Sequence, residues 1–336
     1  MTVSIKDVAR VAGVSPATVS RVLGNGTVVS DALRAQVEAA VRKTGYRPNL
    51  SARRLRSRHS QTIGLIVADI RNPFFTAVGR AVEDIAYQAG LRVILCNTDE
   101  NPEKEALYLR LMEEERVTGV IFAPTRQTVD RMTETPQSFP TVLIDRACHR
   151  SQEDAVVLDN HASAGMLVEH LHAQGYRRMI GLFGNASTTG IERHDGYIAA
   201  MTRFGLTPDA VFIPPTSEAA EAEVRRRIAE GVAARPDAVI ASNGLLLMGV
   251  VRAVREAGLV IPGDLAVAGF DNERWTELVG PGITVIEQPV EAIGRTAMAM
   301  LLERLDTPDA PIRKVVLNGR CVVRGSTAAR RTSRAV

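Results

Sequence analysis

From Gln61 onward the sequence repeats one pattern, in which a short and nearly continuous apolar run is followed by an amphipathic stretch of helical length. Runs of this kind are typical of strands that are buried on both faces of a parallel sheet, with helices covering those faces. Four runs precede Asp159 and four follow it, which predicts two α/β lobes with parallel sheets. The runs are TIGLIVAD, LRVILCNTD, VTGVIFAP, TVLIDRA, RRMIGLFG, DAVFIPP, DAVIASN and DLAVAGFDN.

The residues that follow these runs are candidates for a ligand cleft, because ligands of open α/β sheets lie beyond the carboxyl ends of the strands. They combine carboxylates, amides and guanidinium groups with aromatic rings, which suits a polyhydroxylated ligand whose hydroxyls both donate and accept. Taken singly, each is equally compatible with an ordinary loop or salt bridge. The predicted effector-binding residues are Asn72, Phe74, Phe75, Asp145, Arg146, Arg193, Asn243, Asp271 and Gln288.

Two arginines in this set bear on the chemistry of the ligand. Arg146 and Arg193 together would clamp a carboxylate, which favours a sugar acid of the gluconate or ketogluconate type over a neutral sugar. The alternative is that the two guanidinium groups pair with Asp145 and Asp271 within the protein.

The charge of the chain is distributed unevenly. Residues 1–60 contain 11 lysines and arginines and 3 acidic residues, whereas the remaining residues contain 30 and 35. A compact basic segment attached to a mildly acidic body favours a polyanion as the partner of that segment.

Three short helices are predicted in the basic segment. Residues Ile5 to Ala12 carry apolar side chains at i, i+3, i+4 and i+7, and Gly13 ends this helix. Ser15 is a predicted N-cap with Pro16 at the first helical position, and Ser30 caps a third helix. Two short helices joined by a tight glycine turn and braced by a third form a helix-turn-helix, whose second helix lies in the DNA major groove.

The second helix, within VSPATVSRVL, has a face that suits contact with base edges. Ala17, Thr18 and Arg21 lie opposite its apolar side chains. An arginine donates two hydrogen bonds to guanine, and a small apolar group such as that of Ala17 contacts a thymine methyl. A surface three-helix bundle without a partner is the alternative.

The run IKDVARVAGVSPATVSRVLGNG, followed by VVSDALRAQVEAAVRKTGYRPNLSARRLRS, resembles the DNA-binding head of the lactose/galactose repressor (LacI/GalR) family. The resemblance extends over nearly all 336 residues. It implies an N-terminal all-α helix-turn-helix head and a two-lobed α/β core like that of periplasmic sugar-binding proteins. It also implies a homodimeric repressor of a pseudo-palindromic operator, controlled by a small-molecule effector.

The resemblance also assigns residues to the DNA interface. Residues 49–57 would form a hinge helix that orders on operator DNA, with Leu55 as a wedge in the minor groove and nearby arginines at phosphates. A flexible basic linker is the alternative for this segment. The DNA-binding residues implied in this way are Ser15, Pro16, Ala17, Thr18, Arg21, Asn25, Ser30, Tyr46, Arg53, Arg54 and Leu55.

These observations give a domain map. We expect residues 1–48 to form the DNA-binding domain, residues 49–60 the hinge, residues 61–328 the effector-binding and dimerisation core, and residues 329–336 a tail. The core lobes should comprise about 61–160 plus 289–320, and 161–288 plus 321–328. The chain departs from the family pattern at Gly244, where an aspartate usually follows the asparagine, and the departure concerns either a cleft contact or a helix cap.

Enzymatic motifs are missing from the sequence. It contains no GxxxxGK[ST] loop, GxGxxG turn, GxSxG elbow or HExxH pair. His161, His170 and His172 do not have i, i+4 metal spacing, and the cysteines Cys96, Cys148 and Cys321 are predicted to be small buried side chains. We therefore predict neither catalysis nor a metal or cofactor.

Two other functions remain open. No apolar run is long enough for a membrane span and the first residues are charged, so a cytoplasmic protein is expected. A transport-type sugar-binding protein would need an export signal and would leave the basic segment unexplained. A DNA-binding regulator controlled by a protein or phosphorylated partner is the second alternative.

Overall fold

The structure is a computed structural model that describes residues 3–23, 29–46, 60–132, 137–147, 152–233 and 235–329. The chain divides into two compact units, Met1–Ser60 and Gln61–Val336. No helix within the described ranges is long and apolar enough to cross a membrane.

The first unit is a small helical bundle around Val8, Val19 and Val37, whose side chains are fully buried. Gly13, in the left-handed conformation with φ 61°, ends the first helix, as predicted. The side chain of Gln36 donates a 2.8 Å hydrogen bond to a carbonyl at the end of that helix and so joins the first and third helices. The helices are α1 (Ile5–Ala12), α2 (Pro16–Leu23) and α3 (Asp31–Thr44).

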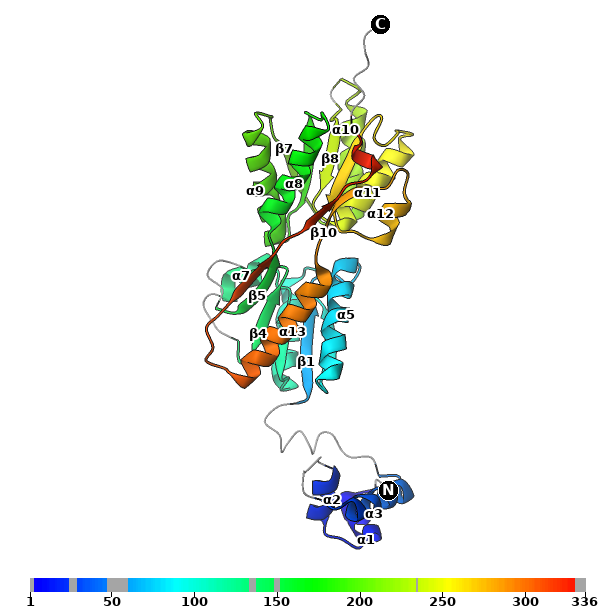
Figure 1. Ribbon diagram of the computed structural model, residues 1–336, viewed down its shortest axis with the longest axis vertical. Coiled ribbons are helices and arrows are strands. Elements are labelled where there is room, and N and C mark those ends of the chain that lie inside the picture. The colour runs from blue at the N-terminus through cyan, green and yellow to red at the C-terminus, as the bar shows by residue number, and fades with distance from the viewer. Residues whose placement is uncertain are drawn as a thin grey trace. The chain divides into compact units, whose positions relative to one another are not determined.

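The second unit consists of two lobes, each built on a sheet of six strands among the described residues (Figure 1). In the first lobe the strand order is β11-β5-β4-β3-β1-β2, and all neighbours are parallel. The strands are β1 (Thr62–Val67), β2 (Arg92–Asn97), β3 (Gly119–Phe122), β4 (Thr141–Ile144), β5 (Asp154–Leu158) and β11 (Lys314–Leu317). The helices are α5 (Pro73–Gln88), α6 (Pro102–Glu114), α7 (Arg126–Met132) and α13 (Val290–Asp306).

The second lobe has the strand order β12-β10-β9-β8-β6-β7, with β12 antiparallel to β10. Helices α8 and α9 pack on one face of the sheet, and α10 and α11 pack on the other (Figure 1). The strands are β6 (Met179–Gly184), β7 (Asp209–Ile213), β8 (Ala238–Ala241), β9 (Ala266–Phe270), β10 (Thr284–Glu287) and β12 (Arg320–Val322). The helices are α8 (Asn160–Ala173), α9 (Thr188–Arg203), α10 (Ser217–Ala229), α11 (Gly244–Glu256), α12 (Arg274–Leu278) and the 3₁₀ turn η1 (Gly325–Thr327).

The two sheets repeat one topology, which confirms the predicted fold class. The order β2-β1-β3-β4-β5 in the first lobe matches β7-β6-β8-β9-β10 in the second. In each sheet the chain order therefore reverses beside the first strand, at a point where α/β sheets bind ligands. Every residue of β1 and β6 is buried, as expected for strands that are covered on both faces.

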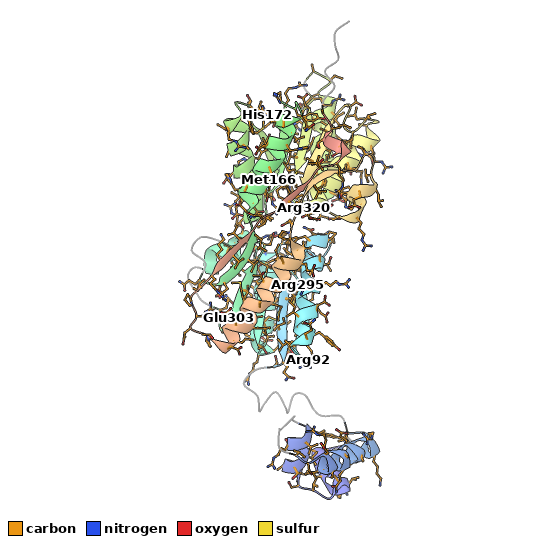
Figure 2. The ribbon with its side chains drawn as sticks, viewed as in Figure 1. Arg92, Met166, His172, Arg295, Glu303 and Arg320 are labelled. Carbon is orange, nitrogen blue, oxygen red and sulfur yellow. The ribbon has the colours of Figure 1, made fainter. Side chains whose placement is uncertain are left out.

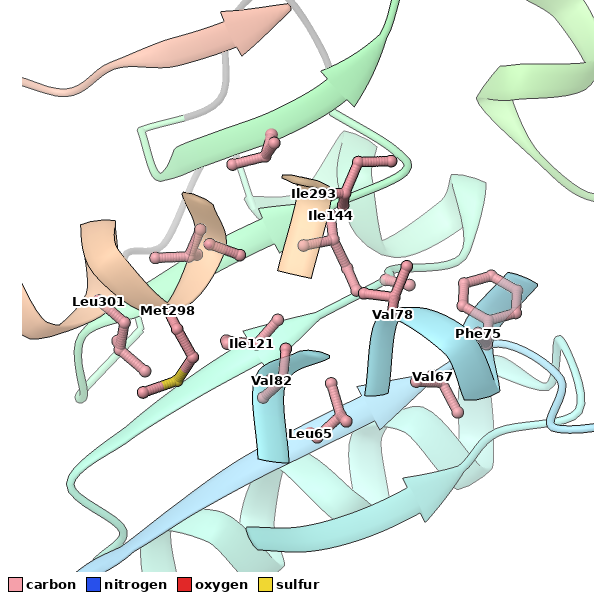
Figure 3. Packing of buried hydrophobic residues seen from close by; sticks show 14 of the residues in the cluster. Leu65, Val67, Phe75, Val78, Val82, Ile121, Ile144, Ile293, Met298 and Leu301 are labelled. Atoms are coloured by element: carbon pink, nitrogen blue, oxygen red, sulfur yellow. The ribbon is translucent and has the colours of Figure 1, made fainter. Parts of the chain in front are cut away.

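One of the two apolar clusters of the first lobe is formed by the sheet and the pair of helices α5 and α13 (Figure 3). These helices approach closely at Gly294, where a Cβ atom would lie 2.8 Å from the carbonyl oxygen of Val78. The apolar side chains that pack there include Leu65, Val67, Phe75, Val78, Val82, Ile121, Ile144, Ile293, Met298 and Leu301.

Three segments connect the lobes: the junction of β5 and α8, the junction of β10 and α13, and the junction of β11 and β12. The third crossing lies at residues 318–319, slightly before the expected lobe boundary, because Arg320 pairs with Glu287 in the second sheet. Figure 2 shows Arg320 beside this crossing and Arg295 on α13 of the first lobe.

Candidate functional site

A cavity lies between the two lobes of the second unit, at the carboxyl ends of the strands. All nine residues that the sequence placed at the cleft line this cavity: Asn72, Phe74, Phe75, Asp145, Arg146, Arg193, Asn243, Asp271 and Gln288. The structure adds Asp69, Glu100, Gly184, Ser187, Thr189, Gly190, Pro215, Ser242 and Leu245.

The loop after β1 places two aromatic rings at the cavity. The Asn72 side chain caps α5 by accepting a 3.1 Å hydrogen bond from the backbone N–H of Phe74, and Pro73 occupies the start of the helix. This cap turns Phe74 and Phe75 inward, where both are buried and meet edge to face with their ring centroids 5.0 Å apart. The rings give the cavity an apolar wall.

Arg146 is engaged within the protein. Its Nη1 donates to Glu100 Oε2 at 2.7 Å and to the carbonyl oxygen of Pro124 at 3.1 Å, and its Nε donates to Asp145 Oδ2 at 3.2 Å. Burial raises the pKa of the Asp145 carboxyl, and the guanidinium beside it opposes that rise. Arg146 therefore pairs with carboxylates of the protein, which is the alternative to a clamp on a ligand carboxylate.

Arg193 is placed differently. Its Nε donates to Asn160 Oδ1 at 2.8 Å, its Nη1 donates to the carbonyl oxygen of Ser242, and its Cζ lies 4.1 Å above the Phe270 ring. The residue is 4% exposed, and no carboxylate of the described chain lies within ion-pair distance of it. Burial lowers the pKa of the Arg193 guanidinium. Arg193 is thus a buried cation whose hydrogen bonds go to neutral oxygen atoms, while the charges of Asp271 and Asp145 oppose the effect of burial.

The second lobe presents acceptor groups to the cavity. Asp271 has a left-handed backbone with φ 75°, and its carboxylate accepts from the Gly244 N–H at 2.8 Å and from Gln288 Nε2 at 2.6 Å. The Oε1 atom of Gln288 is buried and has no hydrogen-bond partner among the described residues. Asn243 caps α11 by accepting from the N–H of Leu246 at 2.8 Å, so the helix keeps its cap beside Gly244.

Glu100 is the principal cavity residue that the sequence did not predict. It follows β2, where the sequence placed a strand end, but its partner Arg146 is distant along the chain. Asp99 and Glu100 have left-handed backbones, with φ 52° and 58°, which turn the loop after β2. The acidic pair after a predicted strand was the available signal, but nothing in the sequence specified its partner.

In the first unit, α2 presents the predicted polar face. The Ser15 side chain accepts from the N–H of Thr18 at 3.1 Å, so the expected N-cap is present. Ser15, Pro16, Ala17 and Arg21 are exposed, and Thr18 is half-buried. These residues therefore form an accessible surface around the start of α2.

Of the other residues predicted at the DNA interface, Ser30 and Tyr46 are described by the structure and four are not. Ser30 caps α3 through a 3.4 Å bond from the N–H of Leu33, and Tyr46 packs partly buried against the helical core. Asn25, Arg53, Arg54 and Leu55, together with Cys148, lie outside the described residues. Within the described chain, no group of three histidine, cysteine or acidic residues is placed to hold a metal ion.

Comparison with known proteins identifies the family. Residues 4–49 match the model of bacterial regulatory proteins of the lacI family, and residues 168–327 match a periplasmic binding protein-like domain. The HTH-type transcriptional regulator KdgR of Bacillus subtilis (strain 168) is 34% identical over 332 residues, which cover 96% of this chain and 97% of KdgR. The chain belongs to the lacI family. It is therefore a DNA-binding transcriptional regulator.

Other lacI-family proteins match over similar lengths. The ribose operon repressor of Escherichia coli (strain K12) is 31% identical, with 96% of this chain and 99% of the repressor covered. The lac repressor dimer bound to operator and the anti-inducer ONPF superposes with a TM-score of 0.87 at 25% identity, over 98% of this chain and 100% of that one. A complex of the transcriptional regulator CelR with cellobiose has a TM-score of 0.71 at 25% identity, over 96% and 99%.

Proposed function

We propose that this lacI-family regulator is a homodimeric repressor that binds a pseudo-palindromic operator and is released from it by a small sugar acid. The observation that carries the choice of ligand is Arg193, a buried guanidinium that makes no direct ion pair among the described residues, although the charges of Asp271 and Asp145 attract it. Burying a charge costs free energy unless the charge is paired. An anionic group on the ligand would supply a direct ion-pair partner for Arg193.

The ion pair between Arg146 and Glu100 narrows this proposal. Because Arg146 is already neutralised inside the protein, a clamp made of two arginines is replaced by a single cation at Arg193. The ligand carboxylate should therefore lie on the second-lobe side of the cavity, near Asn160 and Ser242, which hold the guanidinium in place.

The other cavity groups fit the hydroxyls of a sugar acid. A buried acceptor without a donor is costly, and a ligand hydroxyl would satisfy Gln288 Oε1. Asp145 and Asp271 are further acceptors, and Phe74 and Phe75 supply apolar surface for the carbon skeleton.

On the DNA side, the exposed surface at the start of α2 supports base recognition. The proposal assigns Ala17, Thr18 and Arg21 to base edges, and Ser15 and Pro16 to setting the start of the helix. Two copies related by a two-fold axis would read two half-sites, which is why a pseudo-palindromic operator is expected.

A calorimetric titration tests the ligand class. We expect D-gluconate or 2-keto-D-gluconate to bind the full chain, and D-ribose and cellobiose to bind weakly or not at all. Arg193→Ala should weaken binding of the acid by about 30-fold or more, because the truncation removes the partner of a desolvated charge. Arg252→Ala, on the exposed face of α11, is the matched control and should change affinity by less than about twofold.

The same ligands are then added to the protein bound to a fluorescent duplex that it has selected from a random pool. Release of the duplex by the acid alone supports an inducible repressor. Equal binding of neutral sugars, with no effect of Arg193→Ala, would contradict the sugar-acid assignment. Silence across the panel would favour control by a protein or phosphorylated partner.

A further inference from the structure

Gly244 lies close to two carboxylates of the second lobe. A Cβ atom at this position would lie 2.5 Å from Oε1 of Glu273 and 3.3 Å from Oδ2 of Asp271. Contacts below 3.0 Å are essentially never found for real Cβ atoms, so a side chain at this position would displace the Glu273 carboxylate, which is the far end of a flexible side chain and can move. The residue opens α11, where alanine is otherwise well tolerated, so the restriction comes from the neighbour and not from the helix.

Glu273 has no helix-capping role that would explain its position. It stands at the N-cap of α12, yet its side chain accepts no capping hydrogen bond from that helix. Its Oε2 instead accepts a 2.7 Å bond from the indole Nε1 of Trp275, and its Oε1 faces Gly244. Burial raises the pKa of the half-buried Glu273 carboxyl, and the negative charge of Asp271 adds to that rise.

The contact continues into the effector cavity. The Gly244 N–H donates to Asp271 Oδ2, and the other oxygen of Asp271 accepts from Gln288 Nε2. Both Asp271 and Gln288 line the cavity, and Gln288 holds the unpartnered acceptor described above. Glu273 itself does not line that cavity; it lies in the adjoining groove. A shift of Gly244 or Asp271 would therefore move two groups that face the ligand.

We propose that Glu273 is a positioning residue for the effector, matched to Gly244, whose carboxylate wedged between Trp275 and the start of α11 fixes the Asp271–Gln288 pair at the cavity. This inference rests on the proposed function of that cavity. It assigns no ligand contact to Glu273. The effect of Glu273 on effector affinity passes through Asp271. This effect requires that residue 244 has no side chain.

A double-mutant cycle tests the matching. Four full-length proteins are compared by titration with D-gluconate: the parent, Gly244→Ala, Glu273→Ala and the double variant. We expect Gly244→Ala to weaken binding by about tenfold when Glu273 is present and by less than about twofold when it is replaced by alanine. Glu273→Gln, which keeps the size of the side chain and the acceptor for the indole, should bind like the parent, whereas Glu273→Ala should bind more weakly.

The fluorescence of Trp275 gives a second measurement that needs no effector, because it is the single tryptophan of the chain. Gly244→Ala should shift its emission by moving the carboxylate away from the indole, and should cause no shift in the Glu273→Ala background. Gly165→Ala is the control, since a Cβ atom there would meet its nearest neighbour, Ala200 Cβ, at an ordinary 3.9 Å. This variant should leave both measurements unchanged.

The outcomes separate this inference from the proposed function. Equal effects of Gly244→Ala in both backgrounds, or parent-like affinity of Glu273→Ala, would overturn the positioning role. If the parent binds no compound of the sugar panel, the ligand assignment fails. The Trp275 emission, which needs no effector, then tests whether Glu273 is matched to Gly244. Emission shifts of the two single variants that simply add in the double variant overturn the inference, and a shift on Gly244→Ala that requires Glu273 supports it.

Discussion

At the scale of single residues, burial raises the pKa of several carboxyl groups, and Glu153 is one of them. Desolvation raises the pKa of Glu153 to about 7, and the adjacent charge of Asp154 acts in the same direction. A hydrogen bond from the Gln137 N–H and the charge of Arg304 oppose the rise without cancelling it. Ionised Glu153 is therefore a source of instability in the first lobe.

This assignment predicts how stability depends on pH. The ordinary pKa is 4.5, so between pH 4.5 and about pH 7 the folded state binds more protons than the unfolded state, and this group's contribution to stability falls as pH rises. Glu153→Gln should unfold at a higher temperature than the parent at pH 8, by a free energy on the order of 1 kcal/mol after allowing for solvent screening. At pH 4.5 the two proteins should have closely similar melting temperatures.

Thermal unfolding followed by circular dichroism at both pH values checks this difference. Glu291→Gln, which replaces an exposed glutamate of α13, is the control. The difference in melting temperature between this variant and the parent should be the same at the two pH values. A Glu153→Gln protein that is no more stable than the parent at pH 8 would show that the carboxyl is not held above its ordinary pKa.

At the scale of secondary-structure elements, the packing of α5 on α13 depends on Gly294. A Cβ atom at this position would lie 2.7 Å from Ala81 Cβ and 2.8 Å from the Val78 carbonyl oxygen, and backbone cannot move aside as a flexible side chain can. Gly294→Ala should therefore destabilise the chain by about 1 to 3 kcal/mol, measured by urea unfolding. Gly165→Ala on α8, whose Cβ meets nothing closer than 3.9 Å, should be neutral or slightly stabilising; equal effects of the two variants would contradict the close-packing account.

The same scale shows what sequence patterns predict and what they do not. Continuous apolar runs predicted eight strands, and parallel strands bring their carboxyl ends to one edge, so the convergence of residues such as Asp145 and Asp271 followed from the pattern. The strands β5, β10, β11 and β12 were not among the eight predicted runs: β11 and β12 are short, partly buried edge strands, whereas β5 and β10 are short strands whose apolar residues are buried. Pairing of Glu100 with Arg146 and the fit of Glu273 against Gly244 depend on distances between side chains, which no run of residues specifies.

At the scale of the whole molecule, the chain combines a basic helical unit, Met1–Ser60, with a two-lobed α/β unit, Gln61–Val336, that contains the periplasmic binding protein-like domain. If the sugar acid releases the operator, the two binding events are linked by one coupling free energy. That linkage acts equally in both directions, and it typically amounts to about 1 to 3 kcal/mol. The operator must therefore weaken binding of the acid by the same factor by which the acid weakens binding of the operator.

Calorimetry on the full chain, with and without operator, measures how much the operator weakens binding of the acid. Operator titrations with and without the acid measure how much the acid weakens binding of the operator. We expect the two factors to agree, at about 5- to 150-fold. Leu55→Ala should weaken operator binding, because the predicted wedge into the minor groove is lost, and should leave the affinity of the free protein for the acid unchanged. If operator affinity survives this substitution, Leu55 is not a wedge. If the acid binds equally well with and without operator, it is a ligand of the cavity but not the signal that controls DNA binding.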